Sequence, residues 1–439
     1  MRTLSDHLQE AFRAYSHKSA LKTVRGTYTY AQLGEKVELY KKQLSSLRDP
    51  KLPIFTLDAP VCPETIALLL ACVHEEVTLF LLNRYLPPFF IKKQLDKLPV
   101  SHIVTEGSLK NSTSIRERFL RIERDAPPPS GELLKQNPLT LLLTSGTTSA
   151  PKLAAHSSDN HLYSALASQT EIPLEPGDTW LLSMPLYHVA GIGIIFRALL
   201  QGAALCLPSA IDALKSVTHC SFVATTLRRF LQAPYTENLK CGFVGGGPIP
   251  PSLEIACKER SLPMLYTYGL TEMSSHVCST RYLLREGGGV CFGKAHENAR
   301  VQIEGEELYV QGKTRFLGYY PKSLPPEVWF PTKDTAKIDE QGRIWIFGRK
   351  DRQFISGGEN IQPAEIEKAL ESLPGVQSAK VLPRPDPEYG MRPIAVVRAT
   401  DFNEEAIKKS LRKILSSYKI PDQIFLENGS ISSLQGKFY

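Results

Sequence analysis

Short apolar runs alternate with helix-like patterns from residue 139 to about residue 345, and this alternation restricts the fold more than any other feature of the sequence. The runs lie at residues 180–184, 203–207, 221–224 and 242–244. Alternation of this kind favours parallel strands that are joined by crossover helices. We therefore expect an α/β protein with a large domain of parallel-rich sheets.

The pattern changes within residues 300–318, which consist of short alternating stretches with glycines at 305 and 312. Apolar and polar residues that alternate between turn residues predict strands of an antiparallel sheet. We expect a β-rich subdomain of the large domain here.

The sequence changes character again after Gly348. A helix is expected to begin near Pro363, and strand candidates at 379–382 and 394–397 precede a second helical pattern at 404–416. We place a domain boundary between residues 348 and 349. Residues 1–348 would form the N-terminal domain and residues 349–439 a small, mobile C-terminal α+β domain.

Length and composition restrict the class of protein. A chain of 439 residues exceeds one ordinary core, and its net charge of +7 (52 basic minus 45 acidic residues) comes from scattered side chains, so no nucleic-acid surface is indicated. The eight cysteines lack zinc-site spacing, which favours reduced core residues in a cytoplasmic protein. The apolar runs are too short to span a membrane. The sequence leaves the oligomeric state open, a homodimer included.

An apolar run at 141–143 ends in a stretch of hydroxyl-bearing and small residues that a lysine follows. Flexible backbone N–H groups, hydroxyls and a mobile cation suit a polyphosphate. The spacing is not that of a Walker A loop. The residues expected to bind phosphate are Thr144, Ser145, Gly146, Thr147, Thr148 and Lys152.

Further motifs follow in order along the chain. They are Gly245-Gly246-Gly247-Pro248, Tyr268-Gly269-Leu270-Thr271-Glu272, Thr332-Lys333-Asp334, Gly348-Arg349, a stretch from Ser356 to Glu367 that begins Ser-Gly-Gly-Glu-Asn-Ile, and Gly436-Lys437. Consecutive glycines let a ligand approach the backbone closely, a carboxylate is a hard ligand for a metal that also binds phosphate, and aspartate accepts hydrogen bonds from hydroxyls.

Together these motifs resemble those of the adenylate-forming superfamily, which includes acyl-CoA synthetases, luciferases and the adenylation domains of peptide synthetases. The resemblance spans nearly the whole chain. It implies that a carboxylate attacks the α-phosphate of ATP to give an acyl-adenylate and pyrophosphate, and that the thiol of CoA then displaces AMP. It also implies a Mg²⁺ ion and a C-terminal domain that rotates between the two steps.

The resemblance assigns roles residue by residue. Glu272 would bind Mg²⁺, Asp351 would be the hinge, and Thr144, Glu272, His188 and Lys437 would be the catalytic residues. The remaining nucleotide contacts are assigned to Gly246, Gly247, Tyr268, Gly269, Thr271, Asp334 and Arg349, and the pantetheine passage of CoA to Gly357 and Gly358.

Several features are most similar to the o-succinylbenzoate–CoA ligases of menaquinone biosynthesis. They are the Pro-Leu-Tyr-His-Val-Ala-Gly segment at 185–191, the glycine motifs, and His156 with Asn160 after the phosphate loop. His188 and Gly191 would border the acyl pocket. Arg197 is a single charge in the apolar run 192–200, so either a substrate carboxylate or a protein acid would be its partner.

Two alternatives remain open. The chain could be a CoA ligase for another aromatic or fatty acid, which an uncharged acyl pocket would favour. It could also be a non-catalytic relative that binds a nucleotide. Ser149, Leu153 and Lys333, which stand where the superfamily commonly has glycine, suggest that reading.

Overall fold

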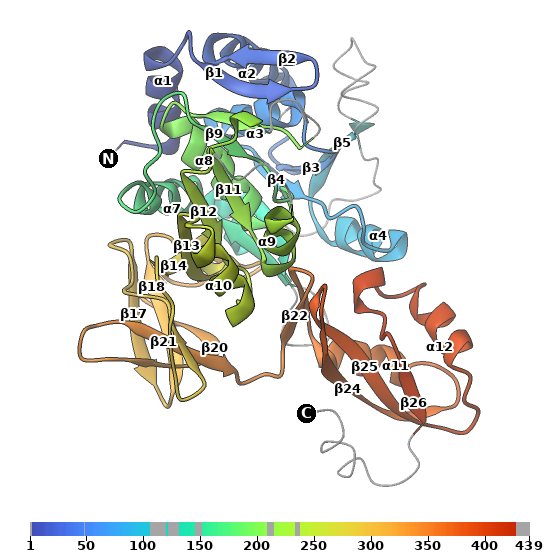
Figure 1. The fold of residues 1–439 in the computed structure, drawn as a ribbon. Helices are drawn as coiled ribbons and strands as arrows, with labels where there is room; N and C mark the ends of the chain where they lie inside the picture. Colours follow the sequence, from blue (N-terminus) through green and yellow to red (C-terminus); the bar gives the residue numbers. More distant parts are fainter. Residues whose placement is uncertain are drawn as a thin grey trace.

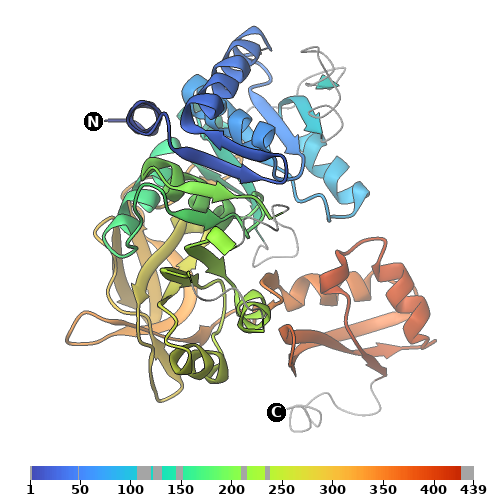
Figure 2. The ribbon, with the colours of Figure 1, turned by 45° about the horizontal axis from the view of Figure 1, so that its top comes forward.

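The computed structural model describes residues 2–47, 49–105, 120–121, 131–144, 152–208, 215–232 and 238–426. Figures 1 and 2 show a large N-terminal body and a separate, smaller C-terminal unit that packs beside helix α9 (Ala224–Leu231). The α/β fold class predicted from the alternating pattern is confirmed.

An eight-stranded sheet contains the four predicted apolar runs as neighbours. Its six central strands are parallel, and an antiparallel strand closes each edge. In spatial order the strands are β14 (Ser275–Thr280), β13 (Met264–Leu270), β12 (Cys241–Val244), β11 (His219–Phe222), β9 (Thr179–Leu181), β10 (Ala204–Cys206), β1 (Ser19–Thr23) and β2 (Gly26–Thr29).

A second sheet of seven strands contains β7 (Thr140–Thr144) and β8 (Lys152–His156), the two strands that flank the expected phosphate loop in the sequence. Its four central strands are parallel, and the remaining pairs are antiparallel. In spatial order they are β19 (Gly318–Tyr319), β8 (Lys152–His156), β7 (Thr140–Thr144), β4 (Thr78–Leu81), β3 (Ile54–Asp58), β5 (Val100–Thr105) and β6 (Leu120–Arg121).

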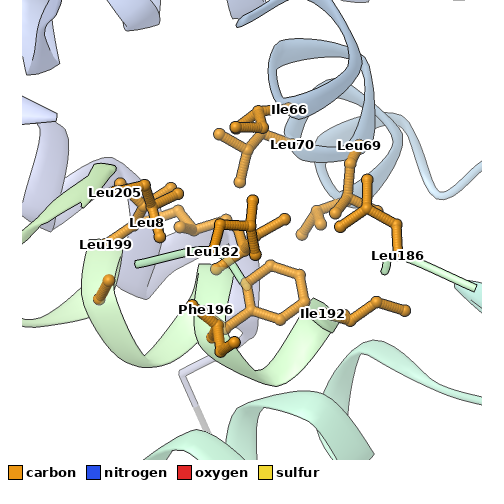
Figure 3. Packing of buried hydrophobic residues seen from close by; sticks show 14 of the residues in the cluster. Leu8, Ile66, Leu69, Leu70, Leu182, Leu186, Ile192, Phe196, Leu199 and Leu205 are labelled. Atoms are coloured by element: carbon orange, nitrogen blue, oxygen red, sulfur yellow. The ribbon is translucent and has the colours of Figure 1, made fainter. Parts of the chain in front are cut away.

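Helices fill the space between these two sheets and form the largest apolar core. Helix α8 (Val189–Leu200) is buried along nearly its whole length, as a helix with apolar residues on all faces must be. Figure 3 shows its Phe196 among side chains of helix α3 (Pro63–Glu75) and of the strands. The other helices of this body are α1 (Leu4–Ala14), α2 (Tyr30–Leu47), α4 (Pro88–Lys97), η1 (Glu132–Gln136), α7 (Ser158–Gln169), α10 (Pro251–Glu259) and η3 (Thr271–Met273).

The expected β-rich subdomain is a six-stranded, fully antiparallel sheet. Gly305 and Gly312 both have positive φ, at the turn and the end of the hairpin formed by residues 299–312. Its strands are β15 (Leu284–Glu286), β16 (Gly289–Cys291), β21 (Ile344–Arg349), β20 (Phe330–Ile338), β18 (Glu307–Gly312) and β17 (Ala299–Glu304).

The C-terminal unit has an apolar core of its own, built from residues 361–424. Helix α11 (Pro363–Glu371) and helix α12 (Glu404–Leu411) form where the sequence predicts them. Helix α12 ends five residues before the expected position, because residues 412–415 continue as hydrogen-bonded turns. The strands are β22 (Phe354–Ser356), β23 (Glu359–Ile361), β24 (Val376–Asp386), β25 (Gly390–Ala399) and β26 (Ile424–Leu426), with a short η4 (Ser417–Lys419). The boundary at 348/349 stays a prediction.

The predictions about the cysteines and about membrane-spanning segments can be compared with the described residues. All eight cysteines are free, and seven of them are buried, so they are core thiols rather than disulfide partners. Among the residues that the structure covers, no helix is both long and apolar enough to cross a membrane.

Candidate active site

The phosphate-loop hairpin brings Thr144 and Lys152 together. The two residues are paired across β7 and β8, and the Thr144 hydroxyl lies 3.4 Å from the Lys152 carbonyl oxygen. The Lys152 ammonium lies 4.8 Å from the centre of the Tyr319 ring. The predicted phosphate ligands Ser145, Gly146, Thr147 and Thr148 lie outside the described residues, as does Lys437.

Glu272, the expected metal ligand, is held from two sides. Its carboxylate accepts a hydrogen bond from the Tyr319 hydroxyl, and its backbone carbonyl accepts one from the Phe316 N–H at 2.8 Å. Burial, followed by the charge of Glu272, raises the pKa of Tyr319, so this phenol stays protonated and donates. Because Tyr319 also borders Lys152, the metal-ligand turn and the phosphate-loop hairpin lie against each other.

Thr271 precedes that carboxylate, and a buried histidine holds its backbone. His156 Nε2 lies 2.7 Å from the Thr271 carbonyl oxygen. Burial lowers the pKa of His156 to about 4, although the hydrogen bond opposes this shift, so the ring is neutral. A carbonyl only accepts hydrogen bonds, which places the proton on Nε2. Asn160, the other member of the His-x3-Asn pair, donates to the Lys313 carbonyl.

Asp334 and Arg349, both expected at the ribose, are paired across β20 and β21. Their side chains are 3.3 Å apart, and Asp334 also accepts a hydrogen bond of 2.5 Å from the Tyr268 hydroxyl. Burial raises the pKa of Asp334, while Arg349 acts in the opposite direction. Tyr268, Asp334 and Arg349 thus form one connected polar group.

The predicted hinge residue joins this group. Asp351 accepts hydrogen bonds from Arg349 at 3.0 and 2.9 Å, which is a bidentate pairing. The next residue, Arg352, has a φ of 59°, and Lys333 has a φ of 64°. Lys333 therefore holds the left-handed conformation that the glycine of the superfamily motif adopts without strain.

Three predicted nucleotide-site glycines pack tightly against backbone or side chains. A Cβ at Gly269 would lie 2.1 Å from the Ser275 carbonyl oxygen, and one at Gly247 would lie 3.0 Å from the Ile355 side chain. Gly246 has a φ of 74°. Gly269 and Gly246 therefore favour glycine strongly, and Gly247 lies against Ile355 of the C-terminal unit.

The C-terminal unit contacts the large body at Gly358, while the preceding Gly357 packs on Tyr389 of its own unit. Both have positive φ, and a Cβ at Gly358 would lie 3.1 Å from the Val223 side chain at the start of α9. Beside this contact, His188 Nε2 lies 3.1 Å from the Glu359 carboxylate. His188 is the N-cap residue of α8, so the glycine loop closes over the start of the helix that leads to Arg197.

Arg197 is a buried cation, 3% exposed. Its guanidinium donates to the hydroxyls of Ser168 at 2.8 Å and Ser275 at 2.7 Å and lies 5.0 Å from the Phe243 ring centre. Burial lowers its pKa to about 10, although the charge of Glu171 opposes this shift. Among the described residues, Glu171 is the acid whose charge raises the pKa of Arg197. Its carboxylate contacts His276 rather than Arg197 itself.

Gly191 lies in the first turn of α8. A Cβ there would lie 2.3 Å from the Pro185 carbonyl oxygen. Glycine therefore allows the 185–188 segment to fold back on the helix that His188 caps, with His188 in contact with Glu359.

The described parts of the candidate site fall into three groups: the hairpin with the Glu272 turn, the Tyr268–Asp334–Arg349 group, and the surroundings of α8 with the Gly357–Gly358 loop. Sequence reasoning gave no role to Tyr319, Glu359 or His156. Tyr319 follows Gly318 without any recognisable motif, whereas Glu359 and His156 stand inside quoted motifs whose order along the chain does not reveal their partners.

Comparison with known proteins identifies the family. Residues 8–320 match the family described as AMP-binding enzyme, and residues 365–428 match the AMP-binding enzyme C-terminal domain. The chain is 31% identical to the 2-succinylbenzoate–CoA ligase of Listeria monocytogenes over 384 residues, with 82% of each chain covered. It is 29% identical to that of Oceanobacillus iheyensis, with 91% of this chain and 90% of the relative covered.

Solved structures share the fold. The o-succinylbenzoate CoA synthetase of Bacillus subtilis, as a double mutant bound to a product analogue, has a TM-score of 0.84 at 24% identity and 98% coverage of each chain. The same enzyme with AMP has a TM-score of 0.68 at 24% identity, covering 96% of this chain and 94% of that one. The resemblance read from the motifs is confirmed: this chain belongs to the AMP-binding enzyme family.

Proposed function

We propose that this chain is an AMP-forming ligase that joins o-succinylbenzoate to CoA. It would consume ATP, form o-succinylbenzoyl-adenylate and release pyrophosphate, then transfer the acyl group to the CoA thiol and release AMP. The observation that carries the proposal is the buried, cationic Arg197 on α8, combined with full-length similarity to 2-succinylbenzoate–CoA ligases. The expected role in cytoplasmic menaquinone biosynthesis belongs to the same proposal.

The nucleotide would bind across the first two groups of residues. Thr144 and Lys152 stand at the two ends of the phosphate loop, so the 145–148 segment and the lysine would contact the β- and γ-phosphates. Asp334 and Arg349 would bind the ribose hydroxyls, and the Tyr268 ring would lie against adenine. Thr271 would contact the α-phosphate, where the substrate carboxylate attacks.

The Glu272 turn fits a Mg²⁺ ion. Within the described residues, no cluster of three or more metal-binding side chains occurs, so a metal here would have one protein carboxylate. Mg²⁺ commonly binds to one or two carboxylates and completes its octahedron with waters and substrate phosphates. Once bound, it would neutralise charge on the phosphates, and Tyr319 would fix the rotamer of the Glu272 carboxylate.

Arg197 would select the acid. o-Succinylbenzoate carries two carboxylates, of which one is activated and the other must be bound. A buried guanidinium whose described hydrogen-bond acceptors are neutral hydroxyls and an imidazole is an unbalanced charge, and a substrate carboxylate would balance it. A pocket with this cation disfavours a plain fatty acid.

The domain arrangement suits the thioester-forming step. Gly358 packs on Val223 and Gly247 on Ile355, so glycines of both units line the seam where pantetheine would enter. The fold of this chain is more similar to the product-analogue complex of the Bacillus subtilis enzyme, with a TM-score of 0.84, than to its AMP complex, with a TM-score of 0.68. This difference supports assigning the present domain arrangement to the thioester-forming step. Asp351 would be the hinge for the alternative arrangement, in which Lys437 reaches the nucleotide.

The decisive experiment incubates the protein with ATP, Mg²⁺, CoA and o-succinylbenzoate and identifies products by mass spectrometry. We expect o-succinylbenzoyl-CoA, AMP and pyrophosphate, and little product from benzoate or a fatty acid. Lys437→Ala should lose adenylate formation and retain CoA transfer from supplied adenylate. Release of ADP and phosphate would contradict adenylation, and equal turnover of benzoate would transfer the assignment to another acid.

A further inference from the structure

We propose that His156 is a positioning residue for the metal-binding turn, which it holds by a hydrogen bond to the Thr271 carbonyl. The inference rests on the proposed function in one respect, since that function places Mg²⁺ at Glu272. His156 belongs to β8 in the second sheet, whereas Thr271 follows β13 of the first sheet. The bond therefore joins the strand after the phosphate loop to the turn that presents Glu272.

The contact is well formed and isolated from water. His156 is 0% exposed, and its Nε2 lies 2.7 Å from the carbonyl oxygen. Its Nδ1 is buried and has no hydrogen-bond partner within the described part of the chain. With its proton on Nε2 and bonded to a carbonyl, the ring has Nδ1 as its only free acceptor, and within the described residues no donor faces that nitrogen. The ring therefore acts as a fixed donor and not as an acid or base.

Two further contacts form a frame with His156. Tyr319, on the strand that pairs with β8, donates to the Glu272 carboxylate, and the Phe316 N–H donates to the Glu272 carbonyl at 2.8 Å. All three bonds run from the phosphate-loop side to the Thr271–Glu272 turn. His156 fixes the peptide between the residue expected at the α-phosphate and the residue expected at the metal, so its loss should let both side chains move.

His161 supplies a matched control. It is 2% exposed, its ring centre lies 5.3 Å from that of His156, and its Nε2 bonds to the Thr140 hydroxyl at 2.9 Å. Thr140 lies at the start of β7, opposite His156 in the β7–β8 ladder, and its hydroxyl bonds to His161 rather than to the Thr271–Glu272 turn. Replacing either histidine removes one buried hydrogen bond from the same core, but only His156 contacts the turn.

The test measures binding of ATP by calorimetry without the acid, once with Mg²⁺ and once with a chelator. Loss of an outer-shell partner commonly weakens metal binding by 10- to 100-fold, so we expect His156→Leu to weaken Mg·ATP binding by about that factor. Metal-free ATP binding, which would lose only the Thr271 contact to the α-phosphate, should weaken less than Mg·ATP binding. His161→Leu should change neither affinity, and His156→Gln, whose amide nitrogen reaches the Nε2 position, should restore Mg·ATP binding.

An equal loss of Mg·ATP and metal-free ATP binding in His156→Leu would overturn the proposal, as would the same loss in His161→Leu. If His156→Leu does not fold, His156→Gln and His156→Asn replace it, because the asparagine amide reaches only the Nδ1 position and should show the defect. These measurements do not involve the acid. A wild-type protein that binds Mg·ATP but leaves o-succinylbenzoate unchanged would refute the proposed function and leave this inference intact.

Discussion

Glu359 of the C-terminal unit lies 3.1 Å from the Nε2 of His188, the N-cap residue of the helix that carries Arg197. The two residues are 171 positions apart in the chain and meet only because the glycine loop packs against the large body. If His188 borders the acyl pocket, as proposed, the pair would lie on the side where CoA enters. It should therefore form in the thioester-forming arrangement and break when the C-terminal unit rotates.

Glu359→Gln should slow CoA transfer and spare adenylate formation. A hydrogen bond to a charged group contributes about 1.5 kcal/mol at the low end of its range, so transfer from supplied acyl-adenylate should slow roughly tenfold. The control is Glu388→Gln, which removes an interdomain ion pair with Arg229 whose side chains are 64% and 53% exposed. Exposed pairs contribute about 0–1 kcal/mol, so this variant should change transfer less. Equal effects of the two variants would argue against a specific closing role for Glu359.

Gly358→Ala should block the passage for pantetheine. The added Cβ would lie 3.1 Å from the Val223 side chain, and the residue has a φ of 90°. Gly390→Ala is the matched control, since Gly390 has a φ of 78° but a Cβ added there would meet no described atom within 4 Å. Both variants should lose similar stability, and only Gly358→Ala should lower the rate of CoA transfer. Recovery in the double variant Gly358→Ala, Val223→Ala would confirm the steric cause.

The sequence predicts the parallel strands β9 to β12 because each is an apolar run bounded by helix-like segments. It assigns Asp334 and Arg349 to one site only through the resemblance to the superfamily. Partners such as Tyr319 and Glu359 are not predictable in this way. Tyr319 reaches Glu272 through the pairing of β19 with β8, and Glu359 reaches His188 through the packing of two units. Neither arrangement leaves a local pattern in the sequence.

Lys333→Gly should stabilise the protein. Lys333 has a φ of 64°. This left-handed conformation costs a residue with a Cβ about 1–2 kcal/mol, and glycine avoids that cost. Glycine also loses more conformational entropy on folding, which offsets about 0.5–1 kcal/mol of the gain. We expect a net gain of up to about 1.5 kcal/mol in the free energy of unfolding, measured with urea. Lys333→Ala keeps the strain and should show no comparable gain. A loss of stability in Lys333→Gly would mean that the lysine side chain makes a compensating contact.

His296 should make the protein less stable in acid. Its Nε2 lies 2.9 Å from the His276 carbonyl oxygen and its Nδ1 accepts from the Asn298 N–H at 3.2 Å, so only the neutral ring satisfies both bonds. Burial, with His276 as the next cause, lowers its pKa to about 4 from 6.5. Between these values the unfolded chain binds the proton and the folded one does not, so stability falls as the pH drops from 6.5 to 4.

Urea unfolding at a series of pH values tests this expectation. His296→Gln should be less stable than the wild type at pH 7, and its free energy of unfolding should fall less steeply between pH 6.5 and 4. In the wild type, His296 would account for up to about 3 kcal/mol of the decrease in the free energy of unfolding over this pH range. An unchanged slope in the variant would assign the acid sensitivity to other buried histidines, such as His219, whose pKa burial also lowers to about 4.

Arg197→Ala should impair recognition of the acid and leave ATP binding nearly unchanged. The guanidinium is 3% exposed and held by Ser168 and Ser275, so it is oriented before the substrate arrives. A charge-assisted, bidentate contact in a dry pocket contributes roughly 2–4 kcal/mol, which predicts a rise of about 30- to 1000-fold in the KM for o-succinylbenzoate. A monocarboxylate analogue should discriminate little between wild type and variant.

Arg315 supplies the control for a merely structural arginine. It is 5% exposed and donates to the backbone carbonyls of Leu324 and Pro325, away from α8. Arg315→Ala should lower the melting temperature without a selective rise in the KM for the acid. Arg197→Ala could instead raise the KM of the monocarboxylate analogue as much as that of o-succinylbenzoate. The guanidinium would then be a structural cation whose charge Glu171 balances through His276. The second carboxylate of the substrate would then bind to another residue.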